Sequence, residues 1–328
     1  MLSPRFPFVL GVGSIFEQRW SRRAMALRLH SLRSLRSART AMGLCTLLCG
    51  TFAPFAFAQA GHTPYSGAAP AQPDASLRVC ADPNNLPFSN HAGQGFENKL
   101  AQMLGDWMHK SVEYTWAMQQ KQFLRDTLDA DKCDVVMSLP TDDKEELTTD
   151  PYYRSTYAMV YRASAPFQLK SLDDPRLRKL EIGVHALGDD WADLPSGSVL
   201  AHRGIVRNVH LYKMFADYGR PNPSADLMEA VAKGDVDVAI AWGPLAGYFA
   251  TREPVKLTVV PITDAHTILP FEFSISMAVR HGDRKLCDQL NAFLREKQDA
   301  IHALLAGYGV PQLKMDAAMP RTNTITQR

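Results

Sequence analysis

Two stretches of the chain alternate short apolar segments with segments of helical spacing, and the second stretch restarts the pattern of the first. Short apolar runs predict buried strands, whereas apolar residues at every third or fourth position predict helices. A strand–helix–strand alternation predicts a parallel sheet covered by helices, so two α/β lobes are expected in succession. The first has predicted strands at 77–81, 112–116 and 133–139 and helices at 95–110 and 123–128; the second has strands at 180–185 and 236–242 and a helix at 225–233.

One short sequence pattern occurs in both lobes. Residues 128–136 and 231–239 each lead from a predicted helix, through a polar turn, to an aspartate followed by two apolar residues. The same pattern at corresponding places favours an internal structural duplication. A last predicted strand at 271–280 leads into an amphipathic segment at 283–305, which ends at Gly307, a residue type that commonly stops helices.

The N-terminal residues predict an export signal. Residues 1–40 contain eight arginines and one acid, and an apolar run follows from Ala41 to Phe57. This order is typical of a secretory signal peptide, and the run is too short to span a membrane stably. Cleavage is expected near Ala58, with delivery to the periplasm. Residues 59–75, rich in Gly, Pro and Ala, are expected to form a flexible tether.

The net charge of the chain changes once the predicted signal peptide, residues 1–58, is removed. Lys+Arg falls from 36 to 28 and Asp+Glu from 34 to 33, so the formal charge moves from +2 to −5. No basic face for nucleic acid is then expected. Met25 and Met42 are alternative translation starts within the signal. The rest of the chain is long enough to bury two cores.

Three cysteines follow the predicted cleavage site: Cys80, Cys133 and Cys287. In an oxidising compartment, one pair of them can form a disulfide. Cys80 ends one predicted strand and Cys133 begins another in the same lobe, so this pair is the first choice for a disulfide. Buried free thiols are the alternative.

Several short motifs resemble those of the type II periplasmic solute-binding proteins. They are Asp82 with Pro87-Phe88 after the first strand, Gly95-Phe96-Glu97 at the first helix, Cys133-Asp134-Val135-Val136, and Asp150-Pro151-Tyr152-Tyr153. The resemblance covers about residues 76–312. It implies a two-lobed α/β fold with a hinge, in which each lobe is a mostly parallel sheet flanked by helices. It further implies a discontinuous first lobe, with hinge crossings near Arg162 and Leu269. The expected segments are 76–163 and 270–312 for the first lobe, 164–269 for the second and 313–328 for a tail.

A narrower resemblance is to the MxaJ/XoxJ family. It is carried by RVCADPNNLPFSN, CDVVMSLP, PYYRSTY, SLDDPRLRKLEIGV, RPNPSADLMEAVAKGDVDVAIAWGPLAGYFA and LLAGYGVP, in this order. Members are binding-protein-like periplasmic proteins associated with PQQ-dependent methanol and alcohol dehydrogenases. The resemblance implies a non-catalytic accessory protein that assists maturation or activation of the dehydrogenase, with that enzyme or its cytochrome c as partner. The alternative is the solute-binding component of an ABC importer for a small ligand that is not an amino acid.

Three positions argue against an amino-acid ligand, which needs a cation for its carboxylate and an anion for its ammonium group. The arginine usual in a T-x-x-R turn is replaced by Lys144 in Thr141-Asp142-Asp143-Lys144, a point charge without a bidentate fork. The turn that usually binds the carboxylate contains Asp189-Asp190, which would repel it. At the position where an aspartate usually binds the ammonium group, this chain has Trp242.

An aromatic and polar set remains to line the expected cleft. The candidates are Asn84, Asn85, Phe88, Ser138, Thr141, Tyr152, Tyr153, Asp189 and Trp242. Such a set suits an uncharged or aromatic solute. A filled groove without a ligand is the alternative, because aromatic residues often only pack in cores. The cluster Tyr152-Tyr153-Arg154 is also of a kind enriched at interaction surfaces, or else it is hinge packing.

The sequence carries no motif for catalysis. The ten histidines occur without HExxH or C-x-x-C-H, and G-x-S-x-G is missing. We therefore expect no catalytic residue, no metal and no cofactor. A dehydratase is the remaining enzyme alternative, because the type II fold also hosts dehydratases.

Overall fold

The computed structural model describes residues 76–315 apart from 121, 142, 144–145, 187–193, 215–218 and 264–268. The predicted signal peptide and tether lie outside the described residues. So do Lys144 and the turn that contains Asp189, two of the three positions on which the argument against an amino-acid ligand depends.

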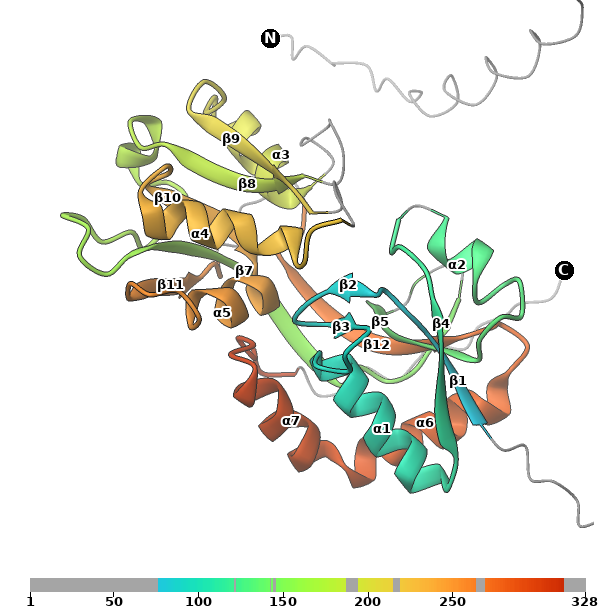
Figure 1. The fold of residues 1–328 in the computed structure, drawn as a ribbon. Helices are drawn as coiled ribbons and strands as arrows, with labels where there is room; N and C mark the ends of the chain where they lie inside the picture. Colours follow the sequence, from blue (N-terminus) through green and yellow to red (C-terminus); the bar gives the residue numbers. More distant parts are fainter. Residues whose placement is uncertain are drawn as a thin grey trace, which may run out of the picture. The chain divides into compact units, whose positions relative to one another are not determined.

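The first lobe has a sheet in which β1 pairs in parallel with β4 on one side and β5 on the other. Helices α1, α6 and α7 pack on one face of this sheet, and the segment around α2 packs on the other. The elements, labelled in Figure 1, are β1 (Ser76–Ala81), β2 (Asn84–Asn85), β3 (Ser89–Asn90), α1 (Phe96–Met108), β4 (Ser111–Trp116), α2 (Phe123–Asp126), β5 (Val135–Pro140), β6 (Leu147–Thr148), α6 (Arg284–Glu296) and α7 (Gln298–Gly307).

The second lobe repeats this plan with β8 at its centre, paired in parallel with β10 and β9. Residues of α4 and α5 form the core on one face of its sheet, and residues of α3 and η1 form the core on the other. Its elements are the 3₁₀ helix η1 (Pro175–Arg178), β8 (Ile182–Ala186), α3 (Pro195–His202), β9 (Val209–Lys213), the 3₁₀ helix η2 (Pro223–Ala225), α4 (Asp226–Lys233), β10 (Val238–Trp242), α5 (Gly243–Ala250) and β11 (Leu257–Pro261).

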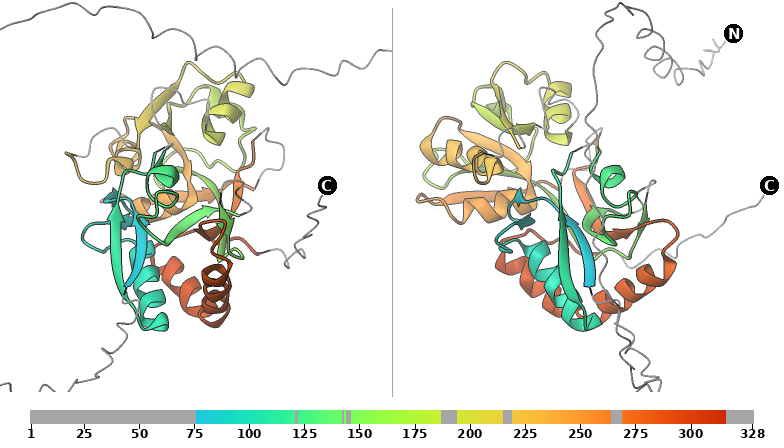
Figure 2. Two further views of the ribbon diagram at one scale, coloured as in Figure 1. Left: turned by 90° about the vertical axis from the view of Figure 1, so that its right-hand side faces the viewer. Right: turned by 45° about the vertical axis from the view of Figure 1, so that its right-hand side comes forward.

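Two antiparallel strands, β7 (Tyr153–Arg162) and β12 (Glu272–Val279), join the lobes. The strand order β4-β1-β5-β12-β7-β10-β8-β9 therefore runs through both lobes. Figure 1 labels the strands, and Figure 2 shows the two lobes from two further sides. The first residues of β7 pair with β12, and the later ones pair with β10 and β11. The fold is thus the two-lobed α/β fold that the sequence predicts.

The change of lobe falls within these two strands. On β7, Tyr153 packs in the first-lobe core, whereas Ala158 already packs in the second-lobe core. On β12, Phe271 precedes the strand in the second-lobe core, and Ile275 packs in the first. The crossings thus lie several residues from Arg162 and Leu269, because each strand keeps its direction while its neighbours change.

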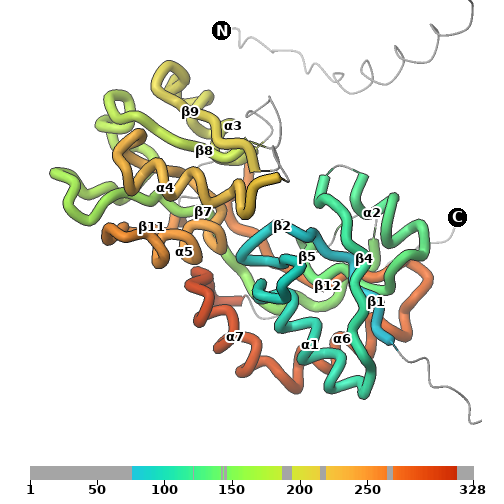
Figure 3. The backbone as a smooth tube through the Cα atoms, viewed as in Figure 1, coloured from blue at the N-terminus to red at the C-terminus, as the bar shows by residue number. Residues whose placement is uncertain are grey.

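The return of the chain to the first lobe is visible in Figure 3, where the last helices lie beside α1. The amphipathic segment expected at 283–305 is two helices, α6 and α7, which meet at Lys297. Its apolar residues Leu290, Phe293, Ile301 and Leu305 are buried in the first-lobe core. Strand β9 is missing from the prediction, because two of its five residues are half-buried and the rest are exposed.

A disulfide joins Cys80 at the end of β1 to Cys133 just before β5, with their Cα atoms 5.5 Å apart. Both cysteines are buried with Phe123, Leu128 and Val136 in a small cluster on the α2 side of the sheet. Cys287 is a buried free cysteine on α6. The disulfide therefore ties the loop that carries α2 to the strands beneath it.

Candidate ligand cavity between the lobes

The first lobe presents a short loop, residues 82–90, toward the second lobe; we call it the bridging loop. Asp82 is buried at its start, and its carboxylate accepts hydrogen bonds of 2.8 Å from the main-chain amides of Asn84 and Gln119. Strands β2 and β3 pair within the loop, and Ser89 donates a 2.7 Å hydrogen bond to the carbonyl of Asp82. These bonds fix the direction in which the loop's side chains point.

The bridging loop packs against the start of α1 so closely that only glycine fits at position 95. A Cβ atom on Gly95 would lie 1.9 Å from the carbonyl oxygen of Phe88. This approach lets the amide of Glu97 donate a 2.9 Å hydrogen bond to that same carbonyl. The first turn of α1 and the bridging loop therefore form one wall.

A cavity of about 300 Å³ lies between this wall and the second lobe. The first lobe contributes Asn85, Phe88, Glu97, Gln119, Ser138 and Tyr153, and the second lobe side contributes Tyr157, His185, Leu194, Met214, Trp242 and Leu245. Five of the nine predicted cleft residues, namely Asn85, Phe88, Ser138, Tyr153 and Trp242, are among them. The volume is at the lower end of the range for small-molecule sites.

Three other predicted residues are not among the residues that line the cavity, and they have different contacts. Asn84 contacts the main chain of the second lobe. Thr141 shares a 2.7 Å hydrogen bond with Ser276 at the junction of β5 and β12. Tyr152 is buried, and its hydroxyl donates to the carbonyl of Met137 and shares a hydrogen bond with Ser138. The ninth candidate, Asp189, lies outside the described residues.

Aromatic rings form much of the cavity wall. Trp242, at the end of β10, lies edge-on to Tyr157 with ring centroids 5.4 Å apart, and the same indole contacts Phe273 at 5.7 Å. Phe88 lies edge-on to Phe96 at 5.4 Å. Burial raises the pKa of the Tyr157 hydroxyl well above its ordinary value, so this ring is uncharged at neutral pH. These contacts hold the rings in place, and three of the rings, Phe88, Tyr157 and Trp242, line the cavity.

Glu97 is a cavity residue that the sequence analysis did not single out. Its side chain is buried, with a residue exposure of 7 %, and it lies beside the hydroxyl of Ser138, which lowers its pKa slightly. Burial raises the pKa of this carboxyl to about 7, with a small further increase from the charge of Asp82. The carboxyl therefore titrates near neutral pH.

His185 on β8 is the second unpredicted polar group. Its imidazole is buried, with Nε2 3.0 Å from the carbonyl oxygen of Ser224, so Nε2 carries the proton and donates. Burial lowers the pKa of this imidazole to about 4, and it is neutral at pH 7. The described residues that line the cavity thus include no lysine, no arginine and no charged histidine.

The two lobes contact each other directly beside the cavity. Asn84 donates a 2.8 Å hydrogen bond to the carbonyl of Arg220 and accepts a 2.8 Å bond from the amide of Asn222. Leu86 is buried in the core of the second lobe, although it belongs to the bridging loop of the first. The lobes therefore meet through both polar and apolar contacts.

A second contact between the lobes lies at the end of α7. The rings of Tyr248 on α5 and Tyr308 after α7 are stacked, 5.7 Å apart and 14° from parallel, and the guanidinium of Arg252 lies 3.5 Å from the centre of the Tyr248 ring. The backbones also approach, because a Cβ atom on Gly247 would lie 1.8 Å from the carbonyl oxygen of Gly309.

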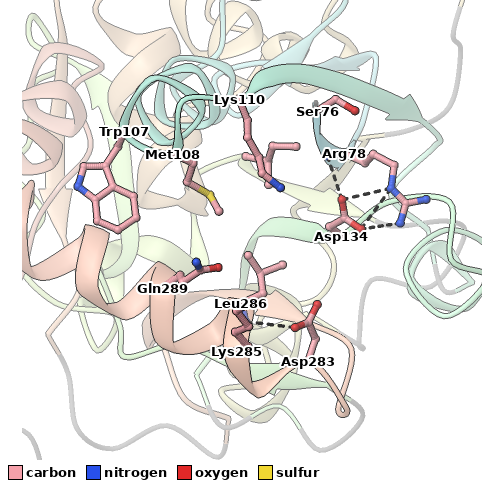
Figure 4. Close-up of a pocket in the computed structure, with 11 residues that line it drawn as sticks. Ser76, Arg78, Trp107, Met108, Lys110, Asp134, Asp283, Lys285, Leu286 and Gln289 are labelled. Carbon is pink, nitrogen blue, oxygen red and sulfur yellow. Dashed lines mark hydrogen bonds and ion pairs between the residues drawn. The ribbon is translucent and has the colours of Figure 1, made fainter. Parts of the chain in front are cut away.

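A larger hollow of about 810 Å³ lies on the first lobe, at the start of β1 (Figure 4). Arg78 projects along its edge and is hydrogen-bonded to Asp134, and Asp283 accepts a 3.1 Å hydrogen bond from the amide of Leu286 at the start of α6. All the residues that line it come from the first lobe. Its charged groups are of both signs and are partly paired, so we do not assign a ligand to it.

No described helix is long and apolar enough to cross a membrane. Among the described residues, no group of three or more His, Cys, Asp or Glu side chains could hold a metal ion.

The fold and the cavity between its lobes define a bacterial solute-binding protein. Residues 77–308 match the bacterial extracellular solute-binding proteins, family 3, and the chain belongs to this family. Within it, the chain is homologous to MoxJ of Methylorubrum extorquens, with 32 % identity over 295 residues, which cover 85 % of this chain and 96 % of that protein.

Solved structures support the same relationship. The periplasmic binding protein XoxJ from Methylobacterium extorquens AM1 is 35 % identical, with a TM-score of 0.61, and the match covers 73 % of this chain and all of that one. MxaJ from Methlophaga aminisulfidivorans MPT is 27 % identical, also with a TM-score of 0.61, covering 72 % of this chain and all of that one. The resemblance to the MxaJ/XoxJ family is confirmed.

Proposed function

We propose that this chain is a periplasmic accessory protein of a PQQ-dependent methanol or alcohol dehydrogenase system, and that it assists maturation or activation of the dehydrogenase by binding it or its cytochrome c. The observation that carries this proposal is the homology to MoxJ, XoxJ and MxaJ over nearly the full length of each. The N-terminal sequence supports export, with cleavage of the signal peptide near Ala58.

The cavity supports a role other than amino-acid delivery. An amino-acid ligand needs a partner for its carboxylate, and the described lining residues offer neither a lysine nor an arginine. Trp242 occupies the position where an aspartate usually binds the ammonium group. Burying an unpaired carboxylate is costly, so amino acids are poor ligands for this cavity.

The contacts between the lobes support the same view. A transport protein of this kind opens and closes around its ligand, whereas here Asn84 and Leu86 of the first lobe are already engaged with the second. A protein whose lobes are held together presents a constant surface to a partner. This suits a role in protein–protein interaction.

Deletion of the gene tests the proposal. We expect the periplasm of the deletion strain to lose most dehydrogenase activity per mole of dehydrogenase, together with a lower PQQ content, and we expect the gene supplied in trans to restore both. The tagged chain should co-purify with the dehydrogenase or its cytochrome c from wild-type periplasm. Unchanged activity and unchanged PQQ content in the deletion strain would overturn the proposal.

The cavity itself favours a second candidate, the solute-binding component of an importer. A 300 Å³ cavity with buried polar groups is large enough for a small solute. Uptake assays with the deletion strain distinguish the two roles: an importer component gives a loss of uptake of one solute with normal dehydrogenase activity.

A further inference from the structure

The carboxyl group of Glu97 lies in the wall of an otherwise aromatic and neutral cavity. Its residue exposure is 7 %, and the neighbouring hydroxyl of Ser138 is hydrogen-bonded to the hydroxyl of Tyr152. An ionised carboxylate can accept about four hydrogen bonds, and a hydroxyl group does not neutralise its charge. A buried charge of this kind normally has a cationic partner.

No described residue that lines the cavity supplies this cation. The lining residues include one acid, Glu97, together with neutral amide, hydroxyl, aromatic and aliphatic groups, and the imidazole of His185 is neutral and hydrogen-bonded to a carbonyl. The amides of Asn85 and Gln119 are also engaged, because they are bonded to each other at 3.0 Å. The charge balance of the cavity thus calls for a positive ligand.

The rings around the carboxyl strengthen this requirement. Phe88, Tyr153, Tyr157 and Trp242 line the same cavity. Aromatic faces attract organic cations, with tryptophan the strongest, and aromatic cages are a common way of binding substituted ammonium groups. An anionic or zwitterionic ligand would instead bring a carboxylate to a site without a cation.

We infer that the cavity between the lobes binds a small organic cation, a protonated or methylated amine, with Glu97 as its counter-ion and the aromatic rings around its alkyl groups. The inference concerns the cavity of the isolated chain. It holds whether or not the chain assists a dehydrogenase, and a failure of the deletion experiment would leave it standing.

Three tyrosines and one histidine around Glu97 keep their neutral state between pH 6 and pH 8. The pKa values of the Tyr114, Tyr152 and Tyr153 hydroxyls are raised by burial, so all three rings stay neutral. The pKa of His185 is lowered to about 4. Asp82 faces Glu97 as a negative charge and accepts two main-chain hydrogen bonds. A pH dependence between 6 and 8 therefore reports on Glu97.

The test uses calorimetric titration of the mature chain with choline, with its neutral isostere 3,3-dimethylbutan-1-ol, with glycine betaine and with tetramethylammonium. We expect choline to bind at least about tenfold more tightly than the neutral alcohol and the zwitterion at pH 8. Equal affinity for choline and the alcohol, or tighter binding of betaine, would overturn the inference.

Tetramethylammonium has no titratable proton, so its pH dependence belongs to the protein. Its affinity should rise about tenfold from pH 6 to pH 8, because only the ionised fraction of Glu97 can bind it. Titrations in buffers of different ionisation enthalpy should show release of a proton from the protein at pH 6.5. If the affinity for tetramethylammonium does not change between pH 6 and pH 8, the wild-type protein alone contradicts the inference.

A substitution and a matched control complete the test. Glu97→Gln should weaken choline binding at least about tenfold and abolish the pH dependence, whereas Glu113→Gln, on the exposed side of β4, should leave both unchanged. Thermal unfolding of each variant verifies that it is folded. A folded Glu97→Gln variant with unaltered choline affinity would refute the assignment.

Discussion

Asn84 in the first lobe forms two hydrogen bonds with the second lobe, and one of them joins its side-chain oxygen to the main-chain amide of Asn222 at 2.8 Å. The other joins its side-chain nitrogen to the carbonyl of Arg220 at the same distance. Asn84 and Asn222 are 138 positions apart in the chain. A single short side chain therefore bridges the two lobes, beside the apolar contact of Leu86 with the second-lobe core.

Replacement of Asn84 by alanine should loosen this bridge. Two hydrogen bonds are lost and the amide of Asn222 loses its partner, so we expect the free energy of unfolding to fall by about 1–2 kcal/mol. Hydrogen exchange at residues 82–90 and 220–224 should accelerate. Asn90→Ala is the control, because the side chain of Asn90 forms its hydrogen bonds within the first lobe, with Gln94. Equal acceleration in both variants would show that Asn84 has no special part in holding the lobes.

Glu97 should make the stability of the protein depend on pH. Its pKa in the folded chain, about 7, exceeds the ordinary value of 4.5, so the folded state holds the proton more tightly than the unfolded state. The contribution of Glu97 to the free energy of unfolding is therefore most favourable below about pH 4.5, and it decreases as the pH rises from 4.5 to 7. Relative to wild type, Glu97→Gln should gain about 1–3 kcal/mol between pH 5 and pH 8.

Urea denaturation of both proteins at pH 5, 6, 7 and 8 provides the measurement. A constant difference across these pH values would mean that Glu97 has an ordinary pKa in the folded protein. A saturating organic cation should restore part of the free energy of unfolding that the wild-type protein loses at pH 8, since a ligand that binds only the folded state stabilises it. At the same ligand concentration, the Glu97→Gln variant should be stabilised less.

Much of the fold could be predicted from the sequence, because it rests on local signals. The strands β1 and β5 are short, mostly apolar runs, and α1 carries Phe96, Leu100 and Leu104 on one face, which the structure buries in the first-lobe core. Local signals could not predict that β7 contributes to the cores of both lobes. The strand contributes Tyr153 to one core and Ala158 to the other, but its apolar pattern is continuous. The sequence pattern therefore does not mark the residue at which the strand passes from one lobe to the other.

Phe88 and Trp242 line the cavity in the structure. They were candidates for their aromatic rings, Phe88 within a motif that resembles the solute-binding proteins and Trp242 at the position where those proteins usually have an aspartate. Glu97 was missed because an acid in the first turn of a helix has a simpler explanation, the attraction to the helix dipole. His185 lies inside a predicted strand, and only the packing of η2 against β8 places the Ser224 carbonyl beside it.

Cys80 and Cys133 should be joined in the exported protein. The structure closes a loop of 53 residues between them, so their replacement by alanine should reduce the free energy of unfolding by about 2–4 kcal/mol. Mass spectrometry of non-reduced peptides should recover the two cysteines in one linked peptide pair. In the denatured, non-reduced mature chain, thiol titration should find one free thiol, from Cys287. Three free thiols would contradict the disulfide.

Gly247 offers a test of the second contact between the lobes, at α5. A Cβ atom at this position would lie 1.8 Å from the carbonyl oxygen of Gly309, a backbone atom that cannot move without shifting the segment after α7. We therefore expect Gly247→Ala to cost about 1–3 kcal/mol and to separate the stacked rings of Tyr248 and Tyr308. Gly282→Ala is the matched control, because a Cβ atom there has no neighbour within 4 Å. Chemical denaturation measures the cost, and the near-ultraviolet circular dichroism of the tyrosines reports on the stack. If Gly247→Ala were as stable as Gly282→Ala, the close approach of α5 to the segment after α7 would be incorrect.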